Sequence, residues 1–342
     1  MDIKENIPLA PLTTFRVGGN ARYFAEIKEH KELAELASFA SAKNVPIFIL
    51  GSGSNILVHE NGFSGLVIKP NIKGISMKPV AEKSVAITAG AGELWDDLVS
   101  ATVEAGLYGL ENLSGIPGTV GAAPVQNIGA YGSEVGKTIS QIEVYDLQSG
   151  ETKVIEGHDC AFGYRDSIFK QAVGKNLVIT RVTFLLTQDG DLNTDYADFT
   201  RYAEQHASVF VTPRDVRSVV LAIRRNKLPD LREYGTAGSF FKNPRVGEAE
   251  LNILKVKFPN LPSYQVENGR IKIPLAWILD KVCGLRGWRD GNVGAYKNQP
   301  LVLVNYGNAK ATEIASAAEK VTKIVKAKTG VNISPEVVYV GF

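Results

Sequence analysis

The sequence predicts an α+β protein with three lobes, and three observations lead to this class. Apolar residues recur at helical spacing in some segments and form short runs typical of buried strands in others. The length of 342 residues corresponds to about two to three domains of ordinary size. The hydrophobic share of 44% is enough for several buried cores, which excludes a disordered chain.

In the first part of the chain, the spacing of apolar residues predicts helices and strands in turn. A helix is predicted at 29–43, and a short buried strand follows it at 45–50. This strand leads into a loop of small residues, after which a second apolar run begins at residue 56. The elements predicted next are strands at 64–69 and 84–89, a helix at about 93–105 and a short helix at 118–123.

In the remainder, strands are predicted at 139–147, 151–156 and 177–187, followed by a helix at 213–227. Thr212 is a suitable N-cap for that helix, and Pro213 suits its first position. Residues 228–230 end it, and we place a domain boundary there. Helices at 274–284 and 308–328 and strands at 300–304 and 336–340 complete the prediction. The predicted lobes are 1–75 with 331–342, then 76–227, then 228–330.

Charge and composition argue against several function classes. The 38 basic and 36 acidic side chains give a net charge of +2 without a basic block, so we expect neither a nucleic-acid nor a membrane partner. We expect a cytoplasmic protein, because no secretory leader and no apolar run near the roughly 20 residues of a membrane span is seen. Neither a disulfide between Cys160 and Cys283 nor a metal site is expected, since the four histidines lack ligand spacing. Nothing demands an oligomer, and we expect a monomer.

A loop of small residues, Gly51-Ser52-Gly53-Ser54-Asn55, follows the first buried strand. Its backbone N–H groups and hydroxyls suit an anion, and its glycines let the backbone approach a pyrophosphate closely. The loop does not open a helix with GxGxxG, and no GK[ST] follows it, so a Rossmann fold and a P-loop are disfavoured. A plain tight turn between two strands is the alternative.

A second glycine-rich segment, 113–132, contains five glycines and two prolines. Irregular loops longer than about 12–15 residues are usually functional or disordered. The isoleucines and valines in this segment make it too apolar for disorder. Two such segments predict a large diphosphate-containing ligand held from two sides, with one long surface loop as the alternative.

Five segments in one order resemble the UDP-N-acetylenolpyruvoylglucosamine reductase (MurB) family. They are GSGSN at 51–55, SGIPGTVGAAPVQNIGAYG at 114–132, GYRDSIFK at 163–170, AGSFFKNP at 237–244 and PEVVYVG at 335–341. The resemblance runs from Pro11 to the last predicted strand, which is nearly the whole chain. It implies an FAD-binding fold of the vanillyl-alcohol-oxidase (PCMH) type with two α/β lobes, plus a C-terminal α+β substrate-binding domain.

The resemblance implies an enzyme of peptidoglycan synthesis that reduces UDP-N-acetylglucosamine enolpyruvate to UDP-N-acetylmuramate, with NADPH as co-substrate and noncovalent FAD. It places substrate contacts at Tyr164, Tyr196, Lys227, Asn243 and Gln299, with Tyr196 and Lys227 at the diphosphate. Residues 195–199 resemble the tyrosine-bearing loop of the family's longer subclass, with an ordinary surface loop as the alternative. The implied FAD contacts are Gly51, Ser52, Gly53, Ser54, Asn55, Gly115, Ile116, Pro117, Gly118, Val120, Gly121, Ala122, Asn127, Gly129, Ala130 and Tyr131.

Three residues match the family's catalytic positions. Ser239 would donate a proton to the carbanion that forms when hydride adds to the substrate double bond. Arg165 would clamp the substrate carboxylate, because a guanidinium binds a carboxylate through two parallel hydrogen bonds. Glu336 would act on the same carboxylate and must then be protonated or paired with Arg165. The alternatives are a bulge before a strand for Ser239 and surface ion pairs for the other two.

Two other functions remain open from the sequence. One is a flavin-dependent oxidase of the same fold group acting on an alcohol or sugar, which would consume oxygen without NADPH. The other is a non-catalytic protein that binds a nucleotide sugar or flavin. The serine in AGSFFKNP and the glutamate near the C-terminus argue against both.

Overall fold

The computed structural model describes residues 2–266 and 269–342, and its internal packing divides the chain into two units. Unit 1 consists of Met1–Ile7, Ala21–Ser52 and Ser64–Arg225. Unit 2 consists of Pro8–Asn20, Gly53–Phe63 and Asn226–Phe342. Both units are therefore built from several chain segments, and the loop at 51–55 runs from one unit into the other. The division into three lobes stays a prediction.

One sheet of unit 1 has the strand order β1-β2-β5-β3, and β3 runs parallel to β5. Helix α1 (Glu32–Lys43) packs on it, because Leu33 and Leu36 lie on one helix face and are fully buried. Asn44 ends the helix in the left-handed conformation, with φ of 51°. The strands are β1 (Lys4–Pro8), β2 (Asn20–Ile27), β3 (Ile47–Ile49) and β5 (Phe63–Pro70).

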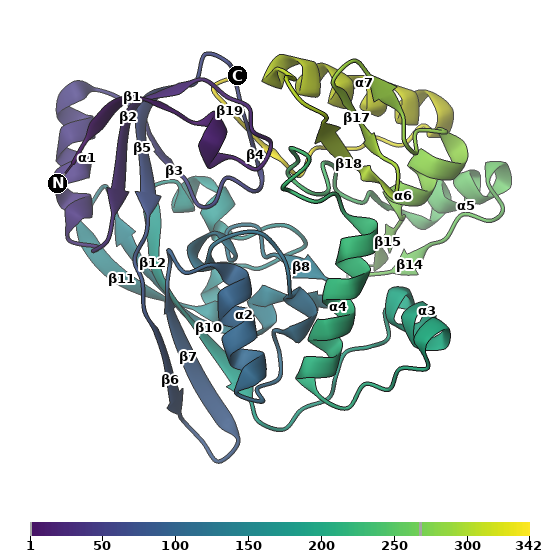
Figure 1. Cartoon of the computed structure of the whole chain (residues 1–342), viewed down its shortest axis with the longest axis horizontal. Coiled ribbons are helices and arrows are strands. Elements are labelled where there is room, and N and C mark those ends of the chain that lie inside the picture. The colour runs from purple at the N-terminus through teal and green to yellow at the C-terminus, as the bar shows by residue number, and fades with distance from the viewer. Residues whose placement is uncertain (1, 267–268) are drawn as a thin grey trace. The chain divides into compact units, whose positions relative to one another are not determined.

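The other large sheet of unit 1 has the order β11-β10-β12-β7-β6, and each of its neighbouring pairs is antiparallel (Figure 1). Helix α2 (Trp95–Glu104) packs on its core face, where Trp95 meets Phe184 edge-to-face at 5.9 Å between ring centroids. The strands are β6 (Ile75–Pro79), β7 (Ser84–Gly90), β10 (Ile139–Asp146), β11 (Glu151–Glu156) and β12 (Leu177–Thr187).

Helices α3 (Ala197–His206) and α4 (Pro213–Lys227) share a small core around Phe199. Helix α4 belongs to unit 1 up to Arg225. The predicted cap of α4 is confirmed: the Thr212 hydroxyl accepts from Asp215 N–H at 3.3 Å, and Asp215 Oδ2 accepts from Thr212 N–H at 2.8 Å. Short strands β8 (Gly129–Ala130) and β9 (Ser133–Glu134) form a hairpin inside the second glycine-rich segment and just after it.

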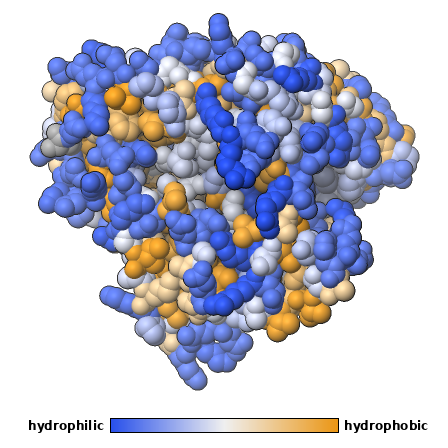
Figure 2. Space-filling view, in the orientation of Figure 1, coloured by the Kyte–Doolittle hydropathy of each residue, from blue (hydrophilic) through white to orange (hydrophobic). Residues whose placement is uncertain are grey.

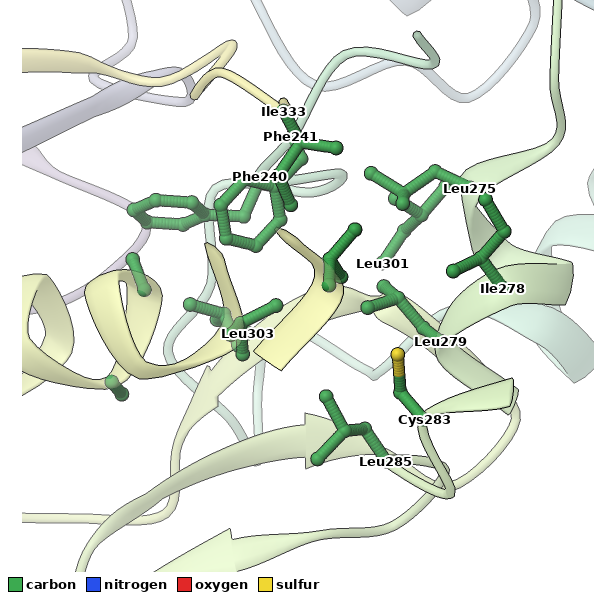
Figure 3. Packing of buried hydrophobic residues seen from close by; sticks show 14 of the residues in the cluster. Phe240, Phe241, Leu275, Ile278, Leu279, Cys283, Leu285, Leu301, Leu303 and Ile333 are labelled. Carbon is green, nitrogen blue, oxygen red and sulfur yellow. The ribbon is translucent and has the colours of Figure 1, made fainter. Parts of the chain in front are cut away.

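Unit 2 is organised around one large core, part of which is shown in Figure 3. Phe240, Phe241 and Leu301 lie among residues of the segment from Leu275 to Leu285. The sheets have the orders β16-β17-β18, β13-β15-β14 and β19-β4, the last pair being parallel. The elements are β4 (Ile56–Val58), β13 (Arg245–Val246), α5 (Glu248–Lys257), β14 (Tyr264–Gln265), β15 (Ile271–Lys272), α6 (Leu275–Trp277), β16 (Arg289–Asp290), β17 (Val293–Tyr296), β18 (Gln299–Asn305), α7 (Ala311–Thr329) and β19 (Val338–Val340).

The prediction of a regular α-helix at 274–284 is wrong, because this segment is only partly α-helical. Only 275–277 is α-helical, and Ile278–Val282 forms a wider π-helical turn. Cys283 N–H donates to Ile278 O at 2.9 Å, which is the five-residue spacing of such a turn. Gly284, with φ of 68°, then ends the segment.

Figure 2 shows hydrophilic residues over much of one face of the molecule, with apolar groups scattered among them. Within 2–266 and 269–342 no helix has the length and apolarity to cross a bilayer, and no three His, Cys, Asp or Glu residues are placed to hold a metal. Cys160 and Cys283 are buried and not disulfide-bonded, and burial raises the pKa of Cys160 to about 11.

Candidate functional site

The two glycine-rich segments meet within unit 1. A Cβ atom added to Gly51 would lie 3.1 Å from Ala122 Cβ and 3.2 Å from Thr119 Oγ1, so backbone of one segment contacts the other. Next to this contact, the hydroxyl of Ser52 is buried and has no hydrogen-bond partner among the described residues. A buried hydroxyl without a partner is costly, which indicates that a polar group of a ligand belongs beside it.

The second segment is attached to the turn between β7 and α2. Val120 N–H donates to Glu93 O, and Gly121 N–H to Ala91 O, each at 2.9 Å. A Cβ atom at Gly121 would lie 2.6 Å from Ala91 Cβ, so only glycine allows this approach. The predicted short helix at 118–123 is present as a single 3-10 turn at Val120–Ala122.

The first turn of α2 holds the beginning of the same segment. Trp95 N–H donates to Gly118 O at 3.1 Å, and its indole N–H donates to Leu113 O at 2.9 Å. Asp96 Oδ1 accepts from Gly115 N–H at 2.6 Å. In this way residues 95 and 96 fix three points of a segment that has little regular structure of its own.

Asn127 is used for structure, although the resemblance places it among the FAD contacts. Its amide nitrogen donates to Glu134 and to Gly163 O, both at 3.0 Å, and its amide oxygen accepts from Gly136 N–H at 2.8 Å. These bonds stabilise its left-handed backbone, with φ of 46°. Its backbone is bonded as well, because Asn127 N–H donates to Pro124 O at 3.1 Å and its carbonyl accepts from Arg165 Nη1 at 3.5 Å.

Arg165 lies at the second glycine-rich segment. Its Nη2 donates to Gly129 O at 2.7 Å, and its guanidinium carbon lies 5.5 Å from the ring centroid of Tyr164. Its own backbone is left-handed, with φ of 56°, and Lys170 Nζ donates to its carbonyl at 3.0 Å. The structure thus places Arg165 and Tyr164 beside the segment for which the family resemblance implies FAD binding.

Tyr196 lies next to the end of this segment. Its ring meets that of Tyr131 edge-to-face at 5.6 Å, and Tyr131 also meets Phe199 at 6.0 Å. Residues 195–199 lead into α3 and are anchored by the fully buried Phe199, while Tyr196 is 41% exposed. Burial raises the pKa of Tyr131 to about 12, although Arg224 acts to lower it.

In unit 2, the segment with Ser239 lies between β18 and the chain near the C-terminus. Ser239 forms an antiparallel bridge with Val302, and Phe240 N–H donates to Leu301 O at 2.8 Å. On the other side, Glu336 N–H donates to Phe240 O at 2.8 Å. Ser239 and Glu336, which are 97 positions apart in the sequence, are thereby held beside each other.

The second half of the first glycine loop is tied to the same place. Asn55 Nδ2 donates to Glu336 O at 3.2 Å, and Val338 N–H donates to Asn55 O at 3.0 Å. Gly53, with φ of 66°, contacts residues 12–13 so closely that a Cβ atom would lie 2.1 Å from Leu12 O. The loop therefore contributes to both units of the molecule.

Three predicted substrate residues also lie in unit 2. Asn243 Oδ1 accepts from Leu275 N–H at 2.9 Å, so part of its amide caps α6. Gln299 begins β18, the strand that pairs with Ser239. Lys227 ends α4, and the neighbouring Asn226 accepts from Asn298 at 2.8 Å, which brings the chain at Lys227 to that at Gln299.

The remaining predicted FAD contacts occupy varied positions. Ile116 is partly buried against the core of unit 1, Pro117 is exposed, Ala130 lies in β8, and Ser54 lies half-buried in the turn before β4. Sequence reasoning missed Asp96, Arg217 and Arg224, which contact Gly115 or each other. The two arginines are seven positions apart on α4, a spacing that puts them on one helix face and offered a signal.

Comparison with known proteins matches two parts of the chain to family models. Residues 21–156 match an FAD-binding domain. Residues 230–340 match the C-terminal domain of UDP-N-acetylenolpyruvoylglucosamine reductase. The two ranges contain most of the residues described above, including both glycine-rich segments, Ser239 and Glu336.

Curated relatives match over nearly the whole chain. The UDP-N-acetylenolpyruvoylglucosamine reductase of Ralstonia nicotianae is 42% identical, covering 97% of this chain and 98% of its own. That of Pseudomonas aeruginosa is 40% identical, covering 98% of each. Among solved structures, the reductase of Thermus caldophilus matches with a TM-score of 0.68 and 23% identity over 99% of both chains, which shows the same fold.

Proposed function

The chain belongs to the UDP-N-acetylenolpyruvoylglucosamine reductase family, and from this premise we propose how its own residues carry out the family's reaction. It is an FAD-dependent oxidoreductase of peptidoglycan synthesis with a PCMH-type FAD-binding fold, and it reduces UDP-N-acetylglucosamine enolpyruvate with NADPH as reductant. When bound, FAD supplies hydride transfer from NADPH to the enolpyruvyl double bond. The protein's residues bind FAD and the substrate, orient the substrate carboxylate and protonate the substrate carbanion.

We assign FAD binding to the two glycine-rich segments. The contact between Gly51 and the Thr119–Ala122 turn brings them together, and the partnerless buried hydroxyl of Ser52 provides a donor at that contact. Closely approaching backbone and hydroxyl donors are what a pyrophosphate requires. These features support the assignment of Ser52, Gly121 and their neighbours to the cofactor.

Arg165 and Glu336 are assigned to the substrate carboxylate. A guanidinium carries five N–H donors in a fixed fork, and the bonds of Arg165 to Gly129 O and Asn127 O orient this group. Charge accumulates on the carboxylate side of the double bond as hydride adds, and a fixed cation there stabilises the transition state. In the proposed role, Glu336 acts on the same carboxylate in its protonated form or paired with Arg165.

Ser239 is assigned as the proton donor. A carbanion is a much stronger base than an alkoxide, so transfer from a serine hydroxyl is favourable. The observation that supports this role most directly is the backbone bonding that holds the segment of Ser239 beside that of Glu336. On its other side, Ser239 pairs with Val302 of β18, the strand that begins at Gln299. The proposed proton donor, Glu336 and Gln299 thus all belong to unit 2.

We assign the remaining predicted residues to binding of the substrate and its nucleotide. Lys227 and Tyr196 are proposed to meet the diphosphate, because a cation and a phenol hydroxyl suit phosphate oxygens. Asn243 and Gln299 are proposed to bind other polar groups of the nucleotide, and Tyr164 to line the substrate site beside Arg165. The exposure of Tyr196 and its contact with Tyr131 support a position where a ligand can reach it.

Ser239→Ala tests this assignment by separating the two half-reactions. Flavin reduction by NADPH should stay near the wild-type rate, while reoxidation by the enolpyruvyl substrate should slow by about 10²–10⁴-fold. Stopped-flow absorbance of the flavin under anaerobic conditions measures both. Ser316→Ala, an exposed serine on α7 in the same unit, serves as the matched control. Equal slowing of both half-reactions would show that Ser239 has a structural role.

We propose that the enzyme acts as a cytoplasmic monomer with a two-lobed FAD-binding part, 1–75 with 331–342 and 76–227, and a substrate-binding domain at 228–330. NADPH and nucleotide sugars are cytoplasmic metabolites, and the near-balanced charge of +2 favours small-molecule substrates over nucleic acid or membrane partners. Light scattering coupled to size exclusion tests the monomer: a mass near 37.0 kDa is expected.

A further inference from the structure

An ion pair that the proposed mechanism does not use lies against the second glycine-rich segment. Arg217 on α4 donates to Asp96 on α2 through both terminal nitrogens, at 2.6 and 3.0 Å. The Arg217 side chain is only 16% exposed. A bidentate, partly buried pair of this kind is geometrically specific, unlike an ordinary surface ion pair.

Asp96 of this pair and Arg224, a second arginine of α4, hold the backbone of Gly115 on both sides of its α-carbon. Asp96 accepts from Gly115 N–H at 2.6 Å, and Arg224 Nε donates to Gly115 O at 3.1 Å. Gly115 has φ of +70°, and a Cβ atom there would lie 2.9 Å from Leu221 Cδ2. Both peptide groups of this glycine are therefore fixed by α2 and α4.

The charge on Asp96 is also maintained by these contacts. Burial alone would raise the pKa of Asp96, but the bonds from Arg217 and from Gly115 N–H outweigh it, and the net pKa lies below the usual value. The carboxylate consequently stays ionised and keeps accepting both hydrogen bonds. Trp95 holds Leu113 O and Gly118 O on either side, so the first turn of α2 grips residues 113–118 at three places.

We propose that Asp96 and Arg217 are positioning residues for FAD. They hold residues 113–118 in the conformation that binds the cofactor, so that little ordering remains to be done on binding. Gly115 shapes the segment, and because its N–H is bound to Asp96 it does not donate to FAD. This inference rests on the proposed assignment of the second glycine-rich segment to FAD.

The test is FAD binding by the apoprotein, measured through quenching of flavin fluorescence. Asp96→Asn and Arg217→Met should weaken binding about tenfold to a hundredfold, as expected for the loss of hydrogen bonds to charged groups. Arg217→Lys keeps the charge without the two-pronged geometry and should weaken binding less than Arg217→Met does. Asp146→Asn is the matched control.

Asp146 is a suitable control because it has the same kind of contacts elsewhere in unit 1. It is the last residue of β10 and accepts from Lys153 Nζ at 2.8 Å and from Gln148 N–H at 2.9 Å. Asp146→Asn should leave the Kd for FAD unchanged. Thermal unfolding of each apoprotein shows which variants fold, and Arg217→Lys, the mildest change, keeps the test open if Asp96→Asn does not fold.

The outcomes distinguish a failure of the positioning role from a failure of the proposed FAD assignment. Folded Asp96→Asn and Arg217→Lys proteins that bind FAD with the wild-type Kd would overturn the positioning role. Ser52→Ala and Gly115→Ala report on the segments themselves. If these two variants fold and bind FAD normally, the proposed assignment of the glycine-rich segments is wrong. If they weaken binding while Asp96→Asn does not, only the positioning inference fails.

Discussion

Thr236 is a buried residue whose hydroxyl sets the turn before Ser239. The hydroxyl donates to Leu303 O at 2.7 Å and accepts from Gly238 N–H at 3.2 Å, and Gly238 has φ of 73°. The left-handed conformation of Gly238 turns the chain so that Ser239 pairs with Val302 of β18. The proposed proton donor thus depends on a neighbour that does not touch the substrate in the proposed scheme.

Thr236→Val keeps the shape of this side chain and removes both hydrogen bonds. We expect the free energy of unfolding to fall by about 1–3 kcal/mol, because the buried Leu303 O and the partly buried Gly238 N–H lose a partner. Reoxidation of the flavin by substrate should slow more than its reduction by NADPH. Thr236→Ser restores the hydroxyl and should recover both properties. Urea unfolding and anaerobic stopped-flow measure them, and an unchanged reoxidation rate in Thr236→Val would contradict the role.

The raised pKa of Tyr131 predicts that stability depends on pH in the alkaline range. Burial raises its pKa to about 12, whereas a tyrosine in the unfolded chain titrates near 10. Between about pH 10 and 12 the unfolded state therefore binds fewer protons than the folded state, and the free energy of unfolding falls as pH rises. Tyr131→Phe should make that fall shallower in urea unfolding measured across this range. The exposed Tyr264→Phe serves as control, and identical slopes for both variants would refute the prediction.

At the scale of elements, α4 carries residues that serve both the proposed positioning of FAD and the proposed binding of substrate. It carries Arg217 and Arg224, which contact Asp96 and Gly115, and it ends at Lys227. Its beginning is fixed by the reciprocal bonds between Thr212 and Asp215. A frayed first turn would leave Arg217, one turn further on, less firmly placed.

Thr212→Ala should accordingly lower the free energy of unfolding by about 1 kcal/mol, the usual loss for a helix N-cap. We also expect a small rise in the Kd for FAD, because Arg217 lies close to the affected turn. Denaturant unfolding and flavin fluorescence measure the two effects. Thr200→Ala, an exposed threonine within α3, is the control and should change neither. A Thr212→Ala protein as stable as the control would contradict the capping role.

The elements predicted correctly are those with a strong local signal. The helices at 29–43 and 213–227 and the strands at 139–147 and 177–187 each show a clear apolar period or cap, and all four are confirmed. The elements that were missed include strands β1, β2, β6 and β17 and helices α3 and α5. Helix α3 is polar apart from a few residues, and its core contact through Phe199 depends on residues such as Phe210 that lie outside it.

The site residues that could be predicted from the sequence are likewise those with a local signal. The glycine-rich segments and Ser239 could be found because their residues are grouped in the sequence. The ion pair of Asp96 with Arg217 could not, because these residues are 121 positions apart and neither lies in a recognisable motif. Long-range hydrogen bonds of this kind depend on tertiary packing, about which local periodicity carries no information.

At the scale of the whole molecule, each unit is completed by distant parts of the chain. Unit 2 takes in Pro8–Asn20 and Gly53–Phe63 together with the C-terminal third. Phe15 is fully buried and meets Phe240 at 6.1 Å, and β4 pairs with β19. The loop at 51–55 can therefore hold Glu336 through Asn55 only once the beginning and the end of the chain have met.

Phe15→Ala tests whether this early segment stabilises unit 2. We expect the free energy of unfolding of unit 2 to fall by about 3–5 kcal/mol, since a fully buried ring leaves a cavity. Phe15→Leu, which leaves a smaller cavity, should cost less than Phe15→Ala does. Trp277 and Trp288 lie in unit 2 and Trp95 in unit 1, so tryptophan-to-phenylalanine backgrounds report on each unit separately. A shift confined to the Trp95 signal would place Phe15 energetically with unit 1. A shift of the Trp277 and Trp288 signals would show that residues near the N-terminus complete the fold around the proposed catalytic serine.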